Sequence, residues 1–355
     1  MGTIDIAGRK VGGGAPTYFI ADIAANHDGS LDRAVQLIHL AAEAGAHAAK
    51  FQNFRAAQIV SKHGFEAMKD QVSHQAKWKK SVFQVYQEAS VPWEWTQTLK
   101  KECDKAKVHY YSTPYDMETI DYLDPFVPAY KIGSGDITWT EEIEHIAKKG
   151  KPTLLATGAS DLGDVQRAVA AFLKHNPQLL LMQCNTNYTG SIENFRYVQL
   201  NVLKTFAAMY PDMPLGLSDH TPGHSAVLGA VALGARAIEK HFTDDTKREG
   251  PDHGFSLDPK AWREMVDRTR ELEYALGDGN KTIQPNEQQT VMIQRRCVYA
   301  ARDLAAGTKL TRQDLTPLRP AYEDGIFPYD LDQVVGRTVR RALKVGDHLR
   351  WTDLE

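Results

Sequence analysis

Short apolar runs alternate with longer segments of helical periodicity along most of the chain. Continuously apolar runs that alternate with helices are typical of strands buried on both faces of a parallel sheet. We expect eight such strands, over residues 18–25, 47–54, 108–114, 129–136, 152–158, 178–185, 216–221 and 237–242. Eight strand–helix units in order predict an α/β protein with a (β/α)₈ TIM barrel, whose active site lies at the carboxyl ends of the strands.

The first strand–helix unit separates the barrel from its main competitor. Ser30 can cap a helix that ends at Gly45. A doubly wound open sheet would need a Gly-rich fingerprint between strand and helix, and residues 26–29 (Asn-His-Asp-Gly) do not provide one. The long polar connection over residues 55–92, with helix expected near 78–86, is an insertion of a kind that is more often functional than idle.

After Leu276 the helical rhythm stops and the chain becomes rich in turns. We expect the barrel over residues 1–280, a linker over 281–290, and a small β-rich domain over 291–355. A domain of about 65 residues is marginally stable alone, so it is expected to pack on something.

Composition narrows the class of protein. The net charge of −3 over 355 residues shows no basic excess that would favour nucleic acid or an anionic membrane. The three cysteines are widely spaced and match no metal or disulfide pattern. The start has no signal-peptide features, and no apolar run approaches the roughly 20 residues of a membrane span. We therefore expect a cytoplasmic protein without nucleic-acid or membrane partners.

Two histidines end neighbouring strands of the expected barrel. His220 and His241 are 21 residues apart and flank an apolar helical run, as in a parallel strand–helix–strand unit. Both should therefore emerge at the same carboxyl end, where two imidazoles can share one divalent metal ion. The alternative is a pair of separately satisfied histidines near a surface.

Polar groups also mark the carboxyl ends of the other expected strands. They are Asp22, Lys50, Gln52, Thr113, Lys131, Ser134, Thr157 and residues 185–187, 218–220 and 239–241. Strand ends meet solvent and are often polar, but that does not explain lysines and histidines inside otherwise apolar runs. We interpret them as an active site at the carboxyl face.

The residue types allow more than one chemistry. Lys50 and Lys131, with nearby hydroxyl groups, can bind a phosphate or carboxylate. A metal on the histidine pair would polarise a carbonyl, while Asp22, Asp136 and Asp252 can accept protons or sugar hydroxyls. Carbon–carbon bond formation between a phosphorylated acid and a carbonyl fits this set. A Schiff-base aldolase that uses either lysine also fits, and the residues alone leave both open.

Several motifs resemble those of the N-acetylneuraminate (sialic acid) synthase family, which includes legionaminate and pseudaminate synthases. They are Asn26-His27-Asp28-Gly29, Ala49-Lys50-Phe51-Gln52, Ser112-Thr113-Pro114, Tyr130-Lys131-Ile132-Gly133-Ser134-Gly135, Gly216-Leu217-Ser218-Asp219-His220-Thr221, Glu239-Lys240-His241-Phe242-Thr243 and Gly250-Pro251-Asp252-His253. The tail from Arg295 onward resembles the family's antifreeze-like (SAF) domain. The resemblance covers nearly the whole chain.

The resemblance implies a condensation of phosphoenolpyruvate with the open-chain aldehyde of an N-acyl hexosamine or diamino hexose, with release of phosphate. The implied metal ligands for Mn²⁺ or Mg²⁺ are His220 and His241, and the implied catalytic residues are Asp22, Lys50, His220 and His241. The implied phosphoenolpyruvate-binding residues are Lys50, Thr113, Lys131, Ser134, Thr186 and Ser218. The implied sugar-binding residues are Gln52, Asp136, Tyr188, Asp252 and Arg319. Arg319 would reach the partner subunit's barrel, which implies a domain-swapped homodimer.

The sequence departs from the family pattern where substrate should lie. Asp22 stands where the family usually has Glu, and the proline of the family's Cys-Thr-x-x-Tyr-Pro stretch is missing at Thr189. These changes favour an altered sugar over N-acetylmannosamine. The alternatives are an enzyme that joins phosphoenolpyruvate to a phosphorylated aldose, for which we find no basic cluster beyond Lys247-Arg248, and a non-catalytic carbohydrate-binding relative.

Overall fold

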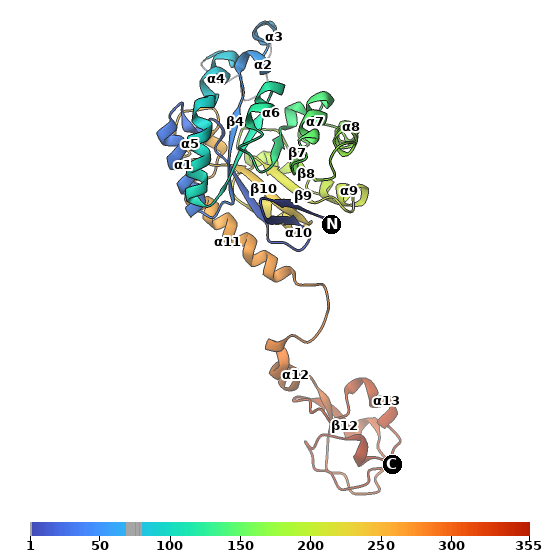
Figure 1. Cartoon of the computed structure of the whole chain (residues 1–355). Helices are drawn as coiled ribbons and strands as arrows, with labels where there is room; N and C mark the ends of the chain where they lie inside the picture. Colours follow the sequence, from blue (N-terminus) through green and yellow to red (C-terminus); the bar gives the residue numbers. More distant parts are fainter. Residues whose placement is uncertain (1, 69–74, 76–77, 79) are drawn as a thin grey trace. The chain divides into compact units, whose positions relative to one another are not determined.

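A computed structural model describes residues 2–68, 75, 78 and 80–355. The chain divides into two compact units, residues 1–277 and 278–355, which are described separately (Figure 1).

The first unit is a nearly closed barrel of parallel strands. The strands are β3 (Tyr18–Asp22), β4 (Ala48–Asn53), β5 (His109–Pro114), β6 (Tyr130–Ile132), β7 (Thr153–Ala156), β8 (Leu179–Cys184), β9 (Leu215–Asp219) and β10 (Ala235–His241). Their hydrogen-bonded order is β5-β4-β3-β10-β9-β8-β7-β6, and the end strands β5 and β6 pack against each other. The predicted (β/α)₈ barrel is confirmed.

Helices follow the strands and surround them (Figure 1). They are α1 (Leu31–Glu43), α5 (Thr96–Ala106), α6 (Met117–Leu123), α7 (Thr140–Lys148), α8 (Leu162–Leu173), α9 (Val202–Met209), α10 (Ser225–Ala232) and α11 (Pro259–Leu276). Helix α1 begins as predicted, because the Ser30 hydroxyl accepts a hydrogen bond from the backbone N–H of Arg33.

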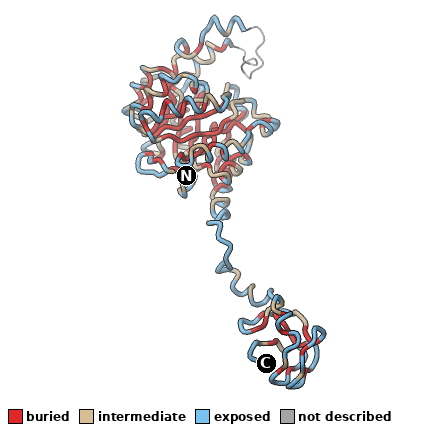
Figure 2. The backbone as a smooth tube through the Cα atoms, turned by 90° about the vertical axis from the view of Figure 1, so that its right-hand side faces the viewer, coloured by how far each residue is buried: buried red, intermediate tan, exposed pale blue. Residues whose placement is uncertain are grey.

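Side chains alternate between the two faces of the strand layer, as the pleat requires. Phe51, Leu217 and Ile238 face the helices and belong to the large outer core. Tyr18 and Ala237 face the barrel interior. Figure 2 shows the strands as the most continuously buried part of this unit.

An N-terminal hairpin fills one end of the barrel. Strands β1 (Thr3–Ile6) and β2 (Arg9–Gly12) pair antiparallel. Their side chains Ile4, Ile6 and Val11 join the interior cluster beside the first residues of the strands, so the hairpin closes the amino-terminal end. No strand was predicted there, since four-residue strands in a Gly-rich lead carry little periodic signal.

The strand predicted over residues 129–136 was too long. Strand β6 ends at Ile132, and residues 134–136 form the short helix η4 (Ser134–Asp136). Gly133 precedes this turn and Gly135 lies within it, and glycine has no side chain to pack in a strand, which weakens the strand there. Ser134 and Asp136 therefore lie on a turn above the barrel rather than inside a strand.

The insertion between β4 and β5 contains α2 (Ala56–Ile59), α3 (Lys62–Ala67), α4 (Val82–Ala89) and η3 (Trp93–Trp95). The helix predicted near residues 78–86 begins at Val82, where Ser81 and Gln84 form a capping box. Residue 79 of that prediction lies outside the described residues.

The second unit has a small core of its own around the antiparallel pair β11 (Cys297–Ala300) and β12 (Leu315–Leu318), with a short helix α13 (Leu331–Val334). Helix α12 (Gln288–Gln294) crosses from the expected linker into the expected small domain, where we predicted turns and strands. A capping box at Gln284 and Glu287 starts the short helix η7 (Pro285–Glu287), which leads directly into α12. Among the residues that the structure describes, none of the helices has both the length and the hydropathy of a membrane span.

Candidate active site

The register of the barrel brings the predicted strand-end residues together. His241 of β10 is level with Asp22 of β3, and Asp22 is level with Lys50 of β4. On the other side of β10, Glu239 is level with Ser218 of β9. Residues that are level on adjacent parallel strands point to the same face, so these side chains share the barrel interior.

Buried ion pairs form the floor of the site. Lys50 Nζ lies 2.6 Å from Asp22 Oδ2 and 3.9 Å from Glu239 Oε1, and Lys131 Nζ lies 3.4 Å from the same Glu239 oxygen. Burial opposes the charge on Lys50, but Asp22 and Glu239 hold its pKa above the ordinary value. Lys50 is therefore a cation even though it is almost fully buried.

Glu239 was predicted only as one of the polar strand-end residues, without a specific role. Its Oε2 atom is buried and has no hydrogen-bond partner among the described residues. It shares the strand face of His241, two positions later, and this period of two was the signal that could have identified it.

Hydroxyl groups lie around the lysines. Thr113 Oγ1 is 3.4 Å from Lys50 Nζ, and Ser218 Oγ donates to Glu239 Oε1 over 3.2 Å. Ser134 Oγ accepts from the backbone N–H of Gly158 over 2.9 Å, so its own proton can be donated elsewhere. The structure thus gathers donors and cations that can bind an oxyanion.

Gly158 permits a close approach in this region. A Cβ atom there would lie 1.9 Å from Thr186 Oγ1 and 2.9 Å from Ser134 Oγ, so no other residue fits without movement. Thr157 precedes Gly158 and was also predicted to belong to the site. Its hydroxyl donates a hydrogen bond to the Met182 carbonyl over 2.9 Å, so its role is structural.

The two histidines face each other. Their ring centroids are 5.4 Å apart, and both residues are buried. His220 Nδ1 lies 3.1 Å from the Asn185 carbonyl oxygen, which orients that ring. His241 Nδ1 is buried without a hydrogen-bond partner among the described residues. Burial, with the neighbouring His220, holds the pKa of His241 well below its usual range, so the imidazole is neutral, which is the form that ligates metals.

A divalent ion fits these donors with two protein ligands and open positions. In the described part of the chain, no set of three or more His, Cys, Asp and Glu side chains is grouped to hold a metal. The nearest additional carboxylates are Asp22, whose Oδ2 is 3.6 Å from His241 Nε2, and Asp252, whose Oδ2 is 3.9 Å from His241 Nδ1.

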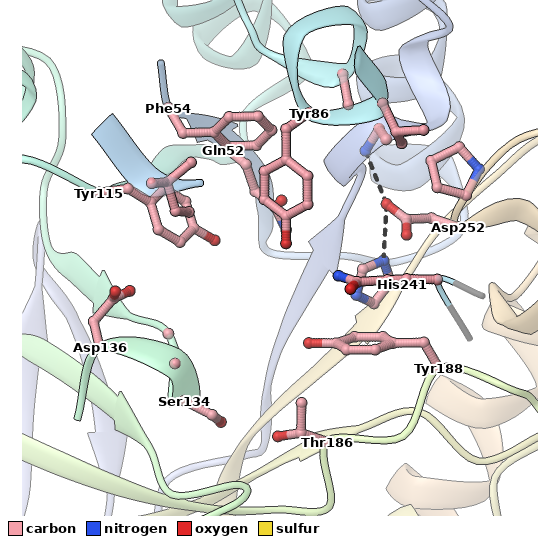
Figure 3. A pocket seen from close by; sticks show the side chains of 18 of the residues that line it. Gln52, Phe54, Tyr86, Tyr115, Ser134, Asp136, Thr186, Tyr188, His241 and Asp252 are labelled. Carbon is pink, nitrogen blue, oxygen red and sulfur yellow. Dashed lines mark hydrogen bonds and ion pairs between the residues drawn. The ribbon is translucent and has the colours of Figure 1, made fainter. Parts of the chain in front are cut away.

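A pocket of about 420 Å³ opens above this floor (Figure 3). Its lining includes the predicted residues Gln52, Ser134, Asp136, Thr186, Tyr188, His241 and Asp252. The insertion contributes Ile59, Trp78, Val85, Tyr86 and Ala89, which sequence reasoning did not assign. The long connection after β4 is therefore part of the pocket wall.

Two carboxyl groups of the pocket are perturbed by burial. Burial raises the pKa of Asp252 to about 6, although a hydrogen bond from the Ala25 backbone N–H opposes the shift. Burial likewise raises the pKa of Asp136 to about 6, opposed by Lys131. Such perturbed groups in a cleft mark candidate functional residues.

Arg319 is exposed on the second unit, so its predicted contact with the sugar stays a prediction. The other residues to which the family resemblance gave a role belong to the barrel unit and lie on the floor or in the wall of the pocket.

The chain is similar to known proteins over almost its whole length. A family model described as the NeuB family matches residues 37–281, and one described as the SAF domain matches residues 295–355. The N,N'-diacetyllegionaminic acid synthase of Legionella pneumophila is 33% identical over 357 residues, which cover 99% of this chain and 98% of that protein. The pseudaminic acid synthase of Campylobacter jejuni is 31% identical and covers 95% of this chain and 96% of its own length.

A solved structure is also similar. The crystal structure of the N-acetylneuraminic acid (sialic acid) synthetase from Leptospira borgpetersenii, in complex with citrate, superposes with a TM-score of 0.71 at 29% identity. The match covers 81% of this chain and 95% of that one. The resemblance inferred from the sequence motifs is confirmed, and the chain belongs to the NeuB family, with a C-terminal SAF domain.

Proposed function

We propose that this protein is a nonulosonic (sialic-type) acid synthase that condenses phosphoenolpyruvate with the open-chain aldehyde of an N-acyl hexosamine or diamino hexose. The observation that carries the proposal is the shared floor of the site. It places two buried lysines and several hydroxyl groups beside a facing pair of histidines. The names of the relatives, legionaminic and pseudaminic acid synthases, support the same class of product.

Lys50 and Lys131 would bind the charged groups of phosphoenolpyruvate, with Thr113, Ser134, Thr186 and Ser218 as hydrogen-bond donors. Charge-assisted hydrogen bonds in a dry site are strong, and their donors are already in place here. The carboxylates Asp22 and Glu239 keep Lys50 charged before the substrate arrives.

His220 and His241 would hold Mn²⁺ or Mg²⁺, which supplies Lewis-acid polarisation of the aldehyde oxygen when bound. Gln52, Tyr188 and Asp252 line the pocket on the same side and would orient the sugar. The new bond joins C3 of phosphoenolpyruvate to the aldehyde carbon, one water molecule is consumed, and phosphate leaves.

Asp22 is placed between the two halves of the reaction. Its Oδ2 atom lies 2.6 Å from Lys50 Nζ and 3.6 Å from His241 Nε2, so it bridges the oxyanion end and the aldehyde end. A carboxylate there can move a proton at the carbon being joined. The distance of 2.6 Å between Lys50 Nζ and Asp22 Oδ2 shows that the shorter Asp side chain reaches the lysine, although the family usually has Glu at this position.

The decisive experiment measures phosphate release from phosphoenolpyruvate with Mn²⁺, with Mg²⁺ and with a chelator, across a panel of N-acyl and diamino hexoses. We expect metal-dependent release with one sugar. Trapping by borohydride with pyruvate, insensitive to chelator, would instead show a Schiff-base aldolase. Sugar binding without release would show a non-catalytic relative, and rapid turnover of N-acetylmannosamine would contradict an altered sugar.

A phosphorylated sugar is disfavoured by the local charges. The only basic residues that we singled out for a second phosphate were Lys247 and Arg248. Arg248 is already bonded to Asp28 Oδ2 over 2.7 Å. Including phosphorylated hexosamines in the panel tests this directly.

The predicted swapped homodimer can be tested by mixing two inactive variants. If Arg319 acts on the partner's barrel, a dimer of one Lys50→Met chain and one Arg319→Ala chain contains one intact site. Co-expressed chains should then regain activity that neither variant has alone. If Arg319 acts within its own chain, no mixed dimer contains an intact site and no activity returns.

A further inference from the structure

The motif Asn26-His27-Asp28-Gly29 forms the turn after β3, and none of its residues lines the pocket. The side chain of His27 faces the insertion, where its Nε2 atom lies 3.2 Å from the Ala89 carbonyl oxygen. Asn26 and Asp28 bond instead to the loop between β10 and α11, which carries Asp252. The turn therefore supports the pocket from behind.

Asp28 begins a chain of hydrogen bonds that runs through a buried histidine. Asp28 Oδ1 lies 2.9 Å from His253 Nε2, and His253 Nδ1 lies 2.7 Å from Thr243 Oγ1. Both ring nitrogens of His253 are thus engaged, which fixes the orientation of the ring. An aspartate, a histidine and a hydroxyl are also the parts of a nucleophilic triad, but Thr243 is completely buried and does not line the pocket. The chain of bonds therefore holds the backbone in place rather than attacking a substrate.

Gly250 permits the close packing of this pair. A Cβ atom there would lie 2.6 Å from His253 Cδ2 and 3.6 Å from Asp28 Oδ1, so a larger residue would push the ring away from the carboxylate. The glycine that opens the motif Gly250-Pro251-Asp252-His253 is therefore what lets the last residue of the motif reach Asp28.

Asp252, which directly precedes His253, is also tied to the turn after β3. The Ala25 backbone N–H donates to Asp252 Oδ2 over 3.1 Å. Ser256 Oγ donates to the Asp252 carbonyl oxygen over 2.7 Å, and Asn26 Nδ2 donates to the same hydroxyl over 2.9 Å. The side chain and the backbone of Asp252 are thus both fixed by the turn.

The carboxylate held in this way points at the histidine pair. Asp252 Oδ2 lies 3.9 Å from His241 Nδ1, and the two groups face each other at the edge of the pocket (Figure 3). A displacement of about 1 Å at a group that orients a substrate can cost about 10²-fold in rate. A support that prevents such a displacement is therefore important for the reaction without touching the substrate.

We propose that Asp28 and His253 are positioning residues, whose hydrogen bond fixes the loop after β10 so that Asp252 meets the sugar beside His241. This inference rests on the proposed synthase function, in which Asp252 orients the sugar. The residues proposed for phosphoenolpyruvate belong to other strand ends, so the bond matters for the sugar and not for phosphoenolpyruvate.

Three variants of the barrel test the bond between Asp28 and His253. His253→Leu removes both hydrogen bonds of the ring, whereas His253→Gln keeps an amide N–H that can reach Asp28. Gly250→Ala disturbs the same bond from the other side, because its methyl group would stand where the ring now packs. The matched control is His145→Leu. His145 Nε2 lies 2.7 Å from Asp121 Oδ1 in a similar pair between two outer helices, away from the pocket lining.

The variants are expected to fold, because Asp28 keeps its other ion-pair partners. Its Oδ2 atom lies 3.1 Å from Arg33 Nε and 2.7 Å from Arg248 Nη2. Replacing His253 therefore leaves no isolated charge behind.

The experiment measures kcat and KM for the N-acyl or diamino hexose that the wild-type enzyme uses best. The dissociation constant of phosphoenolpyruvate in the presence of Mn²⁺ and the urea unfolding midpoint are measured on the same preparations. We expect His253→Leu and Gly250→Ala to lower kcat/KM for the sugar about 10-fold or more, mainly through a higher KM, with unchanged phosphoenolpyruvate binding. His253→Gln should regain part of the loss, and His145→Leu should leave the kinetic values unchanged.

Wild-type kinetics in His253→Leu would overturn the proposal. A loss of activity in proportion to the loss of folded protein, with an unchanged KM for the sugar, would show a purely structural role and overturn it as well. The same holds for equal losses in sugar and phosphoenolpyruvate binding, and for a His253→Gln variant no better than His253→Leu. Each of these outcomes leaves the synthase function in place, whereas a wild-type enzyme that releases no phosphate with any sugar would overturn that function and this inference together.

Discussion

Two buried lysine–aspartate pairs on neighbouring strands have the same chemistry and different tasks. Lys50 and Asp22 lie 2.6 Å apart, and Lys240 and Asp219 lie 2.5 Å apart; all four side chains are almost completely buried. The first pair faces the barrel interior beneath the pocket. The second faces the surrounding helices, as do its strand neighbours Leu217 and Ile238.

The two pairs differ in how many close hydrogen bonds their charged groups make with other residues. Lys240 also donates to the Thr221 carbonyl over 2.6 Å, and Asp219 accepts from both the backbone N–H and the hydroxyl of Thr221. Around Lys50 the other contacts are long, at 3.4 Å to Thr113 and 3.9 Å to Glu239. A closed network stabilises the fold, whereas an open one retains capacity for a ligand.

The largest expected effect is on stability, at the outer pair. Lys240→Met leaves Asp219 as an uncompensated buried charge, which costs about 3–5 kcal/mol. Urea unfolding should show this loss, while the folded fraction still releases phosphate. The double variant Lys240→Met/Asp219→Leu should recover part of the loss, because it removes both charges. An unchanged urea midpoint in Lys240→Met would contradict a stabilising role of the outer pair.

The inner pair should respond in activity instead. Lys50→Met removes a cation aimed at the substrate, and preorganised donors of this kind are worth about 10²–10³ in rate. Asp22 keeps Gln52, whose Nε2 lies 3.3 Å away, so we expect a smaller stability loss than at Lys240. Phosphate release and urea unfolding, measured on the same preparation, separate the two effects. If Lys50→Met lowered only the stability and left phosphate release by the folded fraction unchanged, the two pairs would have the same task.

This contrast also explains what could be predicted from the sequence. A residue's parity along a strand decides which face it occupies, so Asp22, Lys50 and His241 were predictable from apolar runs that end in polar groups. The same parity separates Glu239 from Lys240. The sequence analysis did not use it at that strand, and Glu239 was left without a role.

Other parts of the site do not follow from local pattern. Asp136 was expected at a strand end, but Gly133 and Gly135 turn the chain out of the sheet there. Phe54, Tyr86 and Tyr115 meet only through tertiary packing between the insertion and the strand ends. No periodicity in the sequence encodes such a contact, although the length of the insertion did suggest a function.

Asp22→Glu sharpens the comparison by changing the geometry of the inner pair without changing its charge. Overpacking a buried site by one methylene costs about 1–3 kcal/mol, so we expect roughly a tenfold loss of kcat. Asp22→Asn should lose more, since it keeps the size but removes the charge that pairs with Lys50. Full activity of Asp22→Glu would show that the shorter carboxylate has no special fit to its surroundings.

The smallest expected effect concerns Asp136, a half-buried carboxyl that has no lysine in contact, unlike Asp22 and Asp219. Burial raises its pKa from 3.8 to about 6 against the opposing charge of Lys131, and the other ionisable groups that interact with it among the described residues are Glu142, Tyr86 and Tyr115. The native state therefore holds a proton between these two values. Its contribution to stability is present below pH 3.8 and is lost as pH rises through 6.

Ligand binding should show the opposite trend with pH. The charged carboxylate is the better hydrogen-bond acceptor, so KM for the sugar should fall a few-fold as pH rises from about 5 to about 7. Asp252 titrates in the same window, and the comparison with Asp136→Asn isolates the part that belongs to Asp136. The pH dependence of KM should weaken in that variant. Identical profiles in wild type and variant would mean that Asp136 does not contact the substrate, and that a half-buried carboxyl without a cation in contact is no mark of function in this pocket.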